Sequence, residues 1–328
     1  MIAPPPPRAP WSASLGQVAL ASLAGHLERV PERWLPQLSL RWAGEDVSPR
    51  QALASAGWHP GRQRADLALY LHGLFIDESN WLWGEQGLAQ TLPQQLGWTP
   101  LLVRYNAGLS LEENAASLAA LIEELVAEAG PSCGEVHLLG HSLGGLLVHA
   151  VVRALLERGS DVVDRIGMVL YLATPFYGAP LAQAMESLAG GPSDAEGASW
   201  LRGLLEIRGQ GLRRAGVGVR GQALAGWAAP SELSLGVRSY SVAGSLWPVA
   251  SARPEGRRHD GLVTVASAAG WSPEEGGMGF VERGQFTEIP RLAHQFLPAS
   301  TRVRDVIVRF AEGRGAVVGA GRASALRG

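Results

Sequence analysis

The stretch VHLLGHSLGGLLVHA, residues 136–150, constrains the fold of this chain more than any other. An apolar run of strand character leads into Ser142, which glycines surround, and an apolar helix follows without a break. A serine at so sharp a turn adopts a strained backbone, and side chains two positions away would collide where strand and helix cross. Gly140 and Gly144 remove that collision. We therefore expect Ser142 to project for attack; the plainer interpretation is a glycine-rich turn with a helix-capping serine.

Short apolar runs alternate with helical stretches over much of the chain. The clearest helix follows Ser110, which has capping-box spacing to Glu113, and it stops at Gly130. The expected strands end at polar or glycine residues, as strands buried on both faces do, and cover 67–73, 101–105, 136–140 and 166–174. This alternation predicts an α/β fold: a mostly parallel central sheet with helices on both faces and ligands at the carboxyl ends of the strands.

Changes in this pattern suggest how the chain is divided. Residues 1–64 hold a proline-rich arm and, by periodicity, a helical lead-in, and residues 65–312 form the expected catalytic domain. Within it, a glycine- and arginine-rich segment at about 176–236 is expected to be a lid inserted over the sheet. Strand character resumes at 237–244 and 284–289, a helix follows, and residues 313–328 are expected to form a loose tail.

Composition excludes several classes of function. The formal charge is −2 and no dense basic block occurs, so binding of nucleic acid or anionic lipid is not expected. All 28 cationic side chains are arginines, which excludes a lysine base or Schiff base. Cys133, the sole cysteine, cannot form an intramolecular disulfide. No apolar run is long enough to cross a membrane, so we expect a cytoplasmic protein and leave export open.

The histidines that follow Ser142 in the chain are the candidates for the base that would activate it. A serine hydroxyl is a weak nucleophile until a base removes its proton, and a carboxylate must orient that base. At a strand–serine–helix turn of this kind the groups follow in the order serine, acid, histidine. His149 lies two turns into the helix, and His259 directly precedes the best acid candidate. His294 is therefore the expected base; the alternative is a polar residue at a helix start.

The expected carboxylate is Asp260, in RHDGLVTVASA. It follows the strand at 237–244, and the glycine after it permits a tight turn that aims the side chain inward. Asp161 and Asp164 precede a strand, which places them at the wrong end of the sheet. The other competitors lie in polar loops or inside a strand: Glu255, Glu282 and Glu288. A plain turn aspartate is the alternative interpretation of Asp260.

Attack on a carbonyl creates an oxyanion that two fixed N–H groups must stabilise. The sequence LHGL follows the expected strand at 67–71, so its backbone lies at the carboxyl edge of the sheet. We expect the N–H of Leu74 to be one donor. The N–H of Leu143, directly after the nucleophile, is expected to be the other.

Five segments together resemble the bacterial esterase and lipase families of the α/β-hydrolase superfamily, nearest to the branch that looks like GPI inositol deacylase. They are LHGLFIDESNW, GHSLGGLL, ATPFYGAPL, DGLVTVASA and LAHQFL, and the resemblance covers roughly residues 65–312. It implies the α/β-hydrolase fold with an inserted lid, a triad of Ser142, Asp260 and His294, and an oxyanion hole formed at Leu74 and Leu143.

The resemblance also suggests residues of the substrate pocket. RYNAGLSLEEN looks like a family segment, which implies that Tyr105 and Asn106 shape the pocket floor, and we expect three further residues at the substrate: Phe75, His141 and Phe176. Phe176 stands where relatives often have a histidine, and Pro290-Arg291-Leu292-Ala293 replaces their glycine-rich turn before His294. No cofactor is implied, and no cluster of ligand residues suggests a metal site.

Three functions are compatible with these residues. The first is a carboxylic-ester hydrolase, an esterase or lipase, acting on a small-molecule or lipid acyl ester. The second is an acyltransferase or amidase, since one triad serves all acyl transfers. The third is a non-catalytic binding protein that keeps the fold, although a binding protein has no need of a strained serine. Substrate, chain-length preference and oligomeric state stay open.

Overall fold

The computed structural model describes residues 37–58, 64–74, 76–107, 109–177, 237–248, 258–270, 280 and 285–313 of the 328-residue chain. Within these ranges, eight strands form one sheet in the order β2-β1-β4-β3-β5-β6-β7-β8. The neighbours from β4 to β8 are all parallel, whereas β1 runs antiparallel to both β2 and β4. The mostly parallel sheet expected from the sequence is thus confirmed.

The strands follow the expected runs with small shifts at their ends. Their bounds are β1 Ser39–Trp42, β2 Glu45–Val47, β3 Ala65–Leu71, β4 Thr99–Arg104, β5 Cys133–His141, β6 Ile166–Leu172, β7 Ser239–Ser245 and β8 Phe286–Pro290. The α-helices are α2 Pro49–Ser55, α3 Leu88–Leu96, α4 Leu111–Ala129, α5 Leu143–Glu157, α8 Val265–Ala268 and α9 Thr301–Ala311. The described residues also contain short 3-10 helices: η2 Glu78–Leu82, η3 Gly130–Ser132, η4 Asp161–Arg165 and η7 His294–Ala299.

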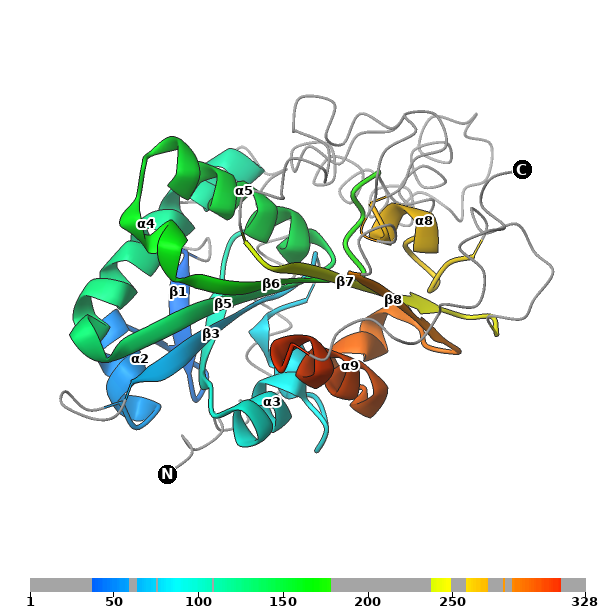
Figure 1. Cartoon of the computed structure of the whole chain (residues 1–328), viewed down its shortest axis with the longest axis horizontal. Helices are drawn as coiled ribbons and strands as arrows, with labels where there is room; N and C mark the ends of the chain where they lie inside the picture. Colours follow the sequence, from blue (N-terminus) through cyan, green and yellow to red (C-terminus); the bar gives the residue numbers. More distant parts are fainter. Residues whose placement is uncertain are drawn as a thin grey trace, which may run out of the picture.

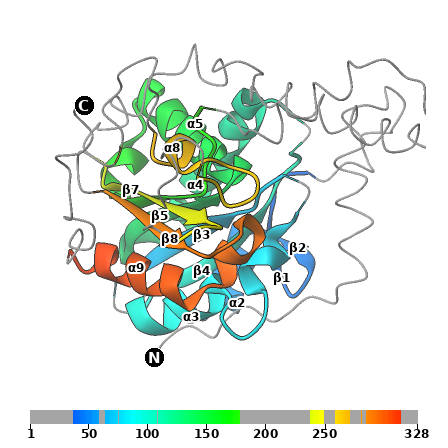
Figure 2. The same cartoon turned by 90° about the vertical axis from the view of Figure 1, so that its right-hand side faces the viewer.

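Helices cover both faces of the sheet. Helices α4 and α5 lie on one face, while α3 and α9 lie on the other (Figures 1 and 2). The central strands are buried on both sides because helices cover each face, and successive side chains of a strand point to opposite faces. In β3, Leu67, Leu69 and Leu71 join the core under α4 and α5, whereas Ala68 and Tyr70 join the core under α3 and α9.

The segment before β3 differs from its expected form. A helical lead-in was expected; of its residues the structure describes 37–58 and Arg64, and there Ser39–Val47 forms the β1–β2 hairpin while Pro49–Ser55 is helical. The hairpin turns at Ala43 and Gly44, which have φ of 54° and 88°. A two-residue turn of this kind needs positive φ at both positions. Alanine seldom adopts positive φ, so the sequence does not indicate this turn. Because β1 pairs with β4, this segment belongs to the sheet of the main domain.

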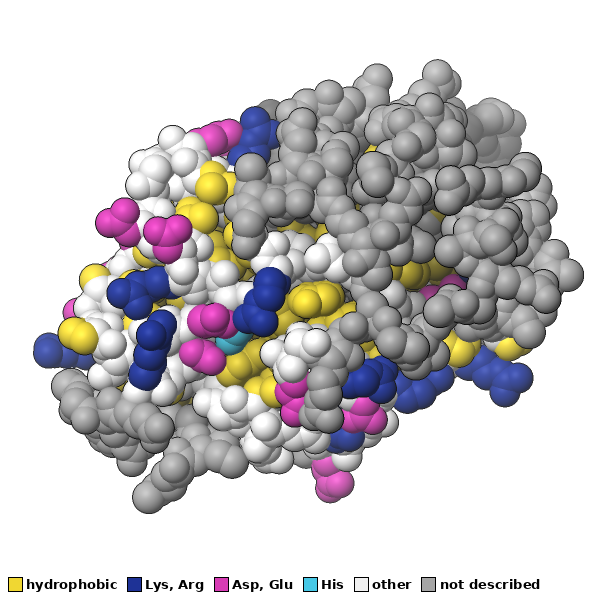
Figure 3. All heavy atoms as spheres, in the orientation of Figure 1, with side chains coloured by type: hydrophobic (Ala, Val, Ile, Leu, Met, Phe, Trp, Pro, Cys, Tyr) yellow, Lys and Arg dark blue, Asp and Glu magenta, His cyan; other side chains and the backbone are white. Residues whose placement is uncertain are grey.

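Other expected segments are confirmed or lie outside the described residues. Ser110 and Glu113 form the capping box at the start of α4. The arm at 1–36, nearly all of the expected lid (178–236) and most of the tail (314–328) fall outside the described residues, so these stay predictions. On the face shown in Figure 3, acidic and basic side chains are interspersed over the described part.

Candidate active site

Ser142 occupies the turn between β5 and α5. Its φ of 55° and ψ of −120° lie in a region that non-glycine residues rarely adopt. The surrounding backbone holds this conformation, since Ser142 N–H donates to the Leu172 carbonyl on β6 at 2.8 Å and Gly145 N–H donates to the Ser142 carbonyl at 2.9 Å. A strained residue that its surroundings maintain in this way is typical of functional sites. The expected strained serine is present.

The glycines around Ser142 allow the strand and helix to cross closely. A Cβ at Gly140 would overlap the backbone of Gly144, and a Cβ at Gly144 would overlap the carbonyls of Leu71 and His72. The steric reason given for both glycines is therefore confirmed. The same reasoning extends to Gly145, whose added Cβ would overlap the side chain of Thr174.

Asp260 and His294 form a buried pair at the carboxyl ends of β7 and β8. Their side chains are 1% and 5% exposed, and His294 Nδ1 lies 2.7 Å from Asp260 Oδ2. Asp260 Oδ1 accepts hydrogen bonds from the N–H groups of Leu262 and Val263, at 3.0 and 2.8 Å, and these fix the carboxylate. Gly261 has φ of 108°, a conformation that favours glycine. The turn that aims Asp260 inward thus depends on the glycine after it.

The loop that carries His294 packs tightly against the end of β7. His294 N–H donates to the Asp260 carbonyl at 2.9 Å. A Cβ at Gly244 would stand 3.0 Å from Asp260 Cβ and would crowd the carbonyl of Leu292. No glycine-rich turn precedes His294, yet the chain turns here, because Arg291 takes a positive φ of 53°.

His141, the residue before Ser142, contacts His294 directly. Its Nε2 lies 3.2 Å from the His294 carbonyl, and the ring centroids are 4.7 Å apart. Burial, followed by the nearby His294, lowers the pKa of His141 well below its usual value. A neutral imidazole with a proton on Nε2 would donate to the carbonyl. The turn that carries Ser142 and the Asp260–His294 pair are therefore neighbours, while the contact between Ser142 Oγ and His294 Nε2 stays a prediction.

The loop after β3 lies beside Ser142. A Cβ added to Gly73 would stand 3.1 Å from Ser142 Cβ, so the backbone of this loop reaches the nucleophile. Leu74 follows directly and packs against the core. Leu143 is the first residue of α5, and an N–H there has no acceptor within its own helix. These positions support both expected oxyanion donors, which remain predictions; Phe75 lies outside the described residues.

Four residues expected in the substrate pocket are buried in the structure: His141, Tyr105, Asn106 and Phe176. Tyr105 donates its hydroxyl to the His72 carbonyl at 2.7 Å, and the Asn106 carbonyl accepts from Asn114. Phe176 packs against Tyr171 and Phe280. Each thus has a contact within the protein, and its role toward a substrate stays a prediction.

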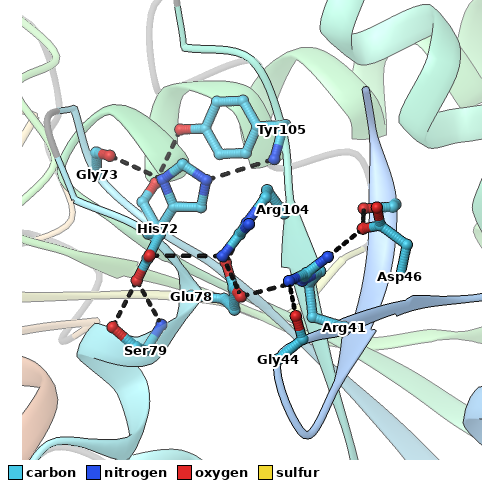
Figure 4. A network of polar contacts seen from close by, with 11 residues as sticks. Arg41, Gly44, Asp46, His72, Gly73, Glu78, Ser79, Arg104 and Tyr105 are labelled. Atoms are coloured by element: carbon cyan, nitrogen blue, oxygen red, sulfur yellow. Dashed lines mark hydrogen bonds and ion pairs between the residues drawn. The ribbon is translucent and has the colours of Figure 1, made fainter. Parts of the chain in front are cut away.

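A buried ionic cluster, which the sequence did not indicate, lies next to the loop after β3 (Figure 4). Arg104 at the end of β4 donates to both carboxylate oxygens of Glu78, at 2.8 and 2.7 Å. Arg104 also contacts Asp77 at 3.4 Å, and Arg41 on β1 contacts Glu78 at 3.2 Å. We call Arg41, Asp77, Glu78 and Arg104 the buried ionic cluster.

The described residues hold neither a membrane-spanning helix nor a cluster of metal-binding side chains. No helix among them combines the length and apolar character that a membrane span requires. In the same ranges, no group of three or more histidine, cysteine or acidic side chains is arranged to hold a metal ion.

The parallel sheet, the helices on both faces and the strained serine between β5 and α5 define the α/β-hydrolase fold, and solved structures agree. The mature form of Bacillus licheniformis lipase BlEst2 superposes with a TM-score of 0.53 at 20% identity, over 77% of this chain and 94% of that one. Its propeptide form gives 0.52 at 19% identity, over 76% and 51%. No protein-family model and no curated protein sequence matches this chain.

Proposed function

We propose that this chain is a serine hydrolase that cleaves carboxylic esters through an acyl-enzyme intermediate. The observation that carries the proposal is the buried Asp260–His294 pair, with 2.7 Å between His294 Nδ1 and Asp260 Oδ2, beside the turn that carries Ser142. An aspartate that accepts from Nδ1–H leaves Nε2 as the free base, which is the form needed to activate a serine. The lipase structures that share the fold support the same class of reaction.

The proposed reaction uses the groups in a fixed order. Ser142 Oγ attacks the acyl carbon while His294 Nε2 takes the hydroxyl proton, and Asp260 stabilises the resulting imidazolium. The N–H groups of Leu74 and Leu143 bind the oxyanion. His294 then protonates the departing alcohol. It next takes a proton from water, which attacks the acyl-enzyme, and the collapse of this second intermediate releases the carboxylic acid, which ionises in solvent, and returns the proton of His294 to Ser142.

The finer parts of the proposal come from the sequence resemblance. They are an esterase or lipase of the branch resembling GPI inositol deacylase and a small-molecule or lipid acyl ester as substrate. The sequence pattern adds a lid at about residues 176–236, and the lack of a long apolar run adds a cytoplasmic location. An acyltransferase or amidase would share the same acyl-enzyme, and competing alcohols and amines would distinguish these by the products formed. A non-catalytic binding protein would form no acyl-enzyme at all.

A substrate panel tests the proposal. Wild type and Ser142→Ala are compared on p-nitrophenyl esters with acyl chains from two carbons to long chains. We expect turnover by the wild type and a loss of about 10³-fold or more in the variant, because the nucleophile is gone. The chain-length profile of the wild type distinguishes an esterase from a lipase. Equal turnover by the two proteins would refute the proposal.

A further inference from the structure

The loop at residues 72–78 is held at both ends by two consecutive residues of the neighbouring chain segment: Arg104, the last residue of β4, and Tyr105, which follows it (Figure 4). At its start, Tyr105 donates its backbone N–H to His72 Nε2 at 3.3 Å and its hydroxyl to the His72 carbonyl at 2.7 Å. At its end, Arg104 binds Asp77 and Glu78. The chain between these anchors contains Gly73, which lies beside Ser142.

These contacts determine which nitrogen of His72 carries the proton. A backbone N–H can only donate, so the Tyr105 N–H requires a lone pair on His72 Nε2. The proton of the neutral ring is therefore on Nδ1, which donates to the Gly73 carbonyl at 2.8 Å. Burial lowers the pKa of His72, which favours this neutral form at pH 7. The ring also stacks on Tyr105, with centroids 4.3 Å apart.

The bond to the Gly73 carbonyl also determines where the next N–H points. In a planar trans peptide unit the C=O and the following N–H point in opposite directions. The carbonyl of Gly73 and the N–H of Leu74 belong to one such unit. When His72 holds the carbonyl on its own side, the Leu74 N–H is directed to the other side.

We propose that His72 is a positioning residue, which aims the backbone N–H of Leu74 at the oxyanion by holding the Gly73 carbonyl. This inference rests on the proposed ester hydrolysis at Ser142 and adds a residue to it. The oxyanion hole then needs little rearrangement during the reaction, because the Leu74 N–H is oriented before substrate binds. The buried ionic cluster anchors the other end of the same loop.

A purely structural role for His72 leads to different expectations. A buried ring that only fills space would affect the free energy of unfolding, and any loss of turnover would follow the loss of folded protein. A positioning role affects kcat in the folded fraction and leaves KM almost unchanged, because the oxyanion exists only beyond the ground state.

Three variants separate these roles on a short-chain p-nitrophenyl ester. His72→Leu keeps the bulk and removes the donor, whereas His72→Asn places an amide N–H near the position of Nδ1. His137→Leu is the matched control, since His137 is also buried and packs against an aromatic ring, that of Trp98, with ring centroids 4.2 Å apart. We expect kcat to fall about 100-fold in His72→Leu, less than 10-fold in His72→Asn, and less than 3-fold in the control, with KM within about 3-fold throughout.

A second readout uses a trifluoromethyl ketone, which forms a tetrahedral oxyanion adduct with a serine. Its affinity should fall in parallel with kcat in His72→Leu, while the affinity for the neutral alcohol product stays unchanged. If His72→Leu does not fold, Tyr105→Phe replaces it. That variant removes the hydroxyl bond to the His72 carbonyl, and we expect kcat to fall about 5-fold at constant KM.

The outcomes distinguish this proposal from the one it rests on. Turnover that is lost in Ser142→Ala but kept within 3-fold in folded His72→Leu, or in Tyr105→Phe where that replaces it, would overturn the role of His72 and leave the ester hydrolase standing. An equal loss in His72→Leu and His72→Asn would also overturn it. A wild type that neither hydrolyses esters nor reacts with a fluorophosphonate would overturn both proposals.

Discussion

His294 Nδ1 lies 2.7 Å from Asp260 Oδ2, although 34 residues separate them in the chain. The adjoining ends of β7 and β8 bring the two residues together. The carboxylate also accepts two backbone N–H groups, which help to hold it in place. The imidazole is therefore held by an acceptor that is already fixed before any substrate binds.

Replacing this acceptor should abolish most of the activity. In Asp260→Asn the amide keeps the size but loses the charge that orients the ring and stabilises the imidazolium. We expect kcat for ester hydrolysis to fall by about 10³-fold or more, with a smaller change in KM. Steady-state kinetics on a p-nitrophenyl ester measure both.

Glu288→Gln is the matched control for this carboxylate. Glu288 is another acidic residue with little exposure, and it pairs with Arg258 at 3.2 Å. We expect a lower melting temperature and a kcat within about 3-fold of wild type. A comparable loss of turnover in both variants would mean that Asp260 acts only by stabilising the fold.

A side chain at position 73 should crowd the nucleophile. In Gly73→Ala the new Cβ would lie 3.1 Å from Ser142 Cβ and 3.3 Å from Ile76 Cδ1, which is tighter than ordinary contact. Position 73 does not have a positive φ, so alanine introduces no backbone strain there. We expect the rate of fluorophosphonate labelling to fall about 10-fold with the melting temperature nearly unchanged. An unchanged labelling rate would show that Gly73 does not adjoin the reacting oxygen.

Breaking the buried ionic cluster should destabilise the fold. Arg104→Met removes the cation that holds Glu78 and Asp77, leaving these acids buried with less compensation. Breaking a buried pair in this way costs about 3–5 kcal/mol. We expect a loss of that order in the free energy of unfolding, measured by urea denaturation.

The control for this loss is an exposed pair. Arg153→Ala removes the bond to Glu157 on the surface of α5, where the side chains are 43% and 62% exposed. Exposed pairs of this kind contribute about 0.3–0.5 kcal/mol. Similar losses in Arg104→Met and Arg153→Ala would contradict the importance of the buried cluster.

Acidification should destabilise the protein through His149. Burial, and then the nearby Arg153, lowers the pKa of His149 to about 4. The unfolded chain, with a histidine pKa of about 6.5, binds the proton first, so the free energy of unfolding falls as the pH drops from about 6.5 to 4. This single group accounts for about 3 kcal/mol over that range.

The measurement is urea denaturation of wild type and His149→Leu at several pH values. His72 and His141 also have lowered pKa values and act in the same direction. The variant should therefore retain part of the acid destabilisation, with a shallower slope against pH. Identical slopes would contradict the assignment to His149, whatever the absolute stabilities.

The sequence predicted the parts of the site that local physics determines. The strand before Ser142, the helix after it and the need for Gly140 and Gly144 all follow from one short stretch. Asp260 and His294 were predicted as partners because chain order and the end of the sheet left few alternatives, and the structure brings the two into contact. Their mutual contact required only that β7 and β8 be neighbours.

The sequence could not predict the contacts that form only when strands distant in the chain pair with each other. Arg41 and Arg104 lie on β1 and β4, and only the pairing of these strands brings both arginines to Glu78. The hairpin of β1 and β2 was missed because its turn contains Ala43, a residue that seldom adopts positive φ. The role of Tyr105 in holding His72 likewise depends on the close approach of β3 and β4.

The most direct test of the central claim is mass spectrometry of the protein after reaction with a fluorophosphonate. The account predicts one adduct per chain, located by peptide analysis on Ser142, formed faster in wild type than in Asp260→Asn, and absent from Ser142→Ala. Folded wild-type protein that forms no adduct, or that carries it on a different residue, would contradict the claim that Ser142 is an activated nucleophile.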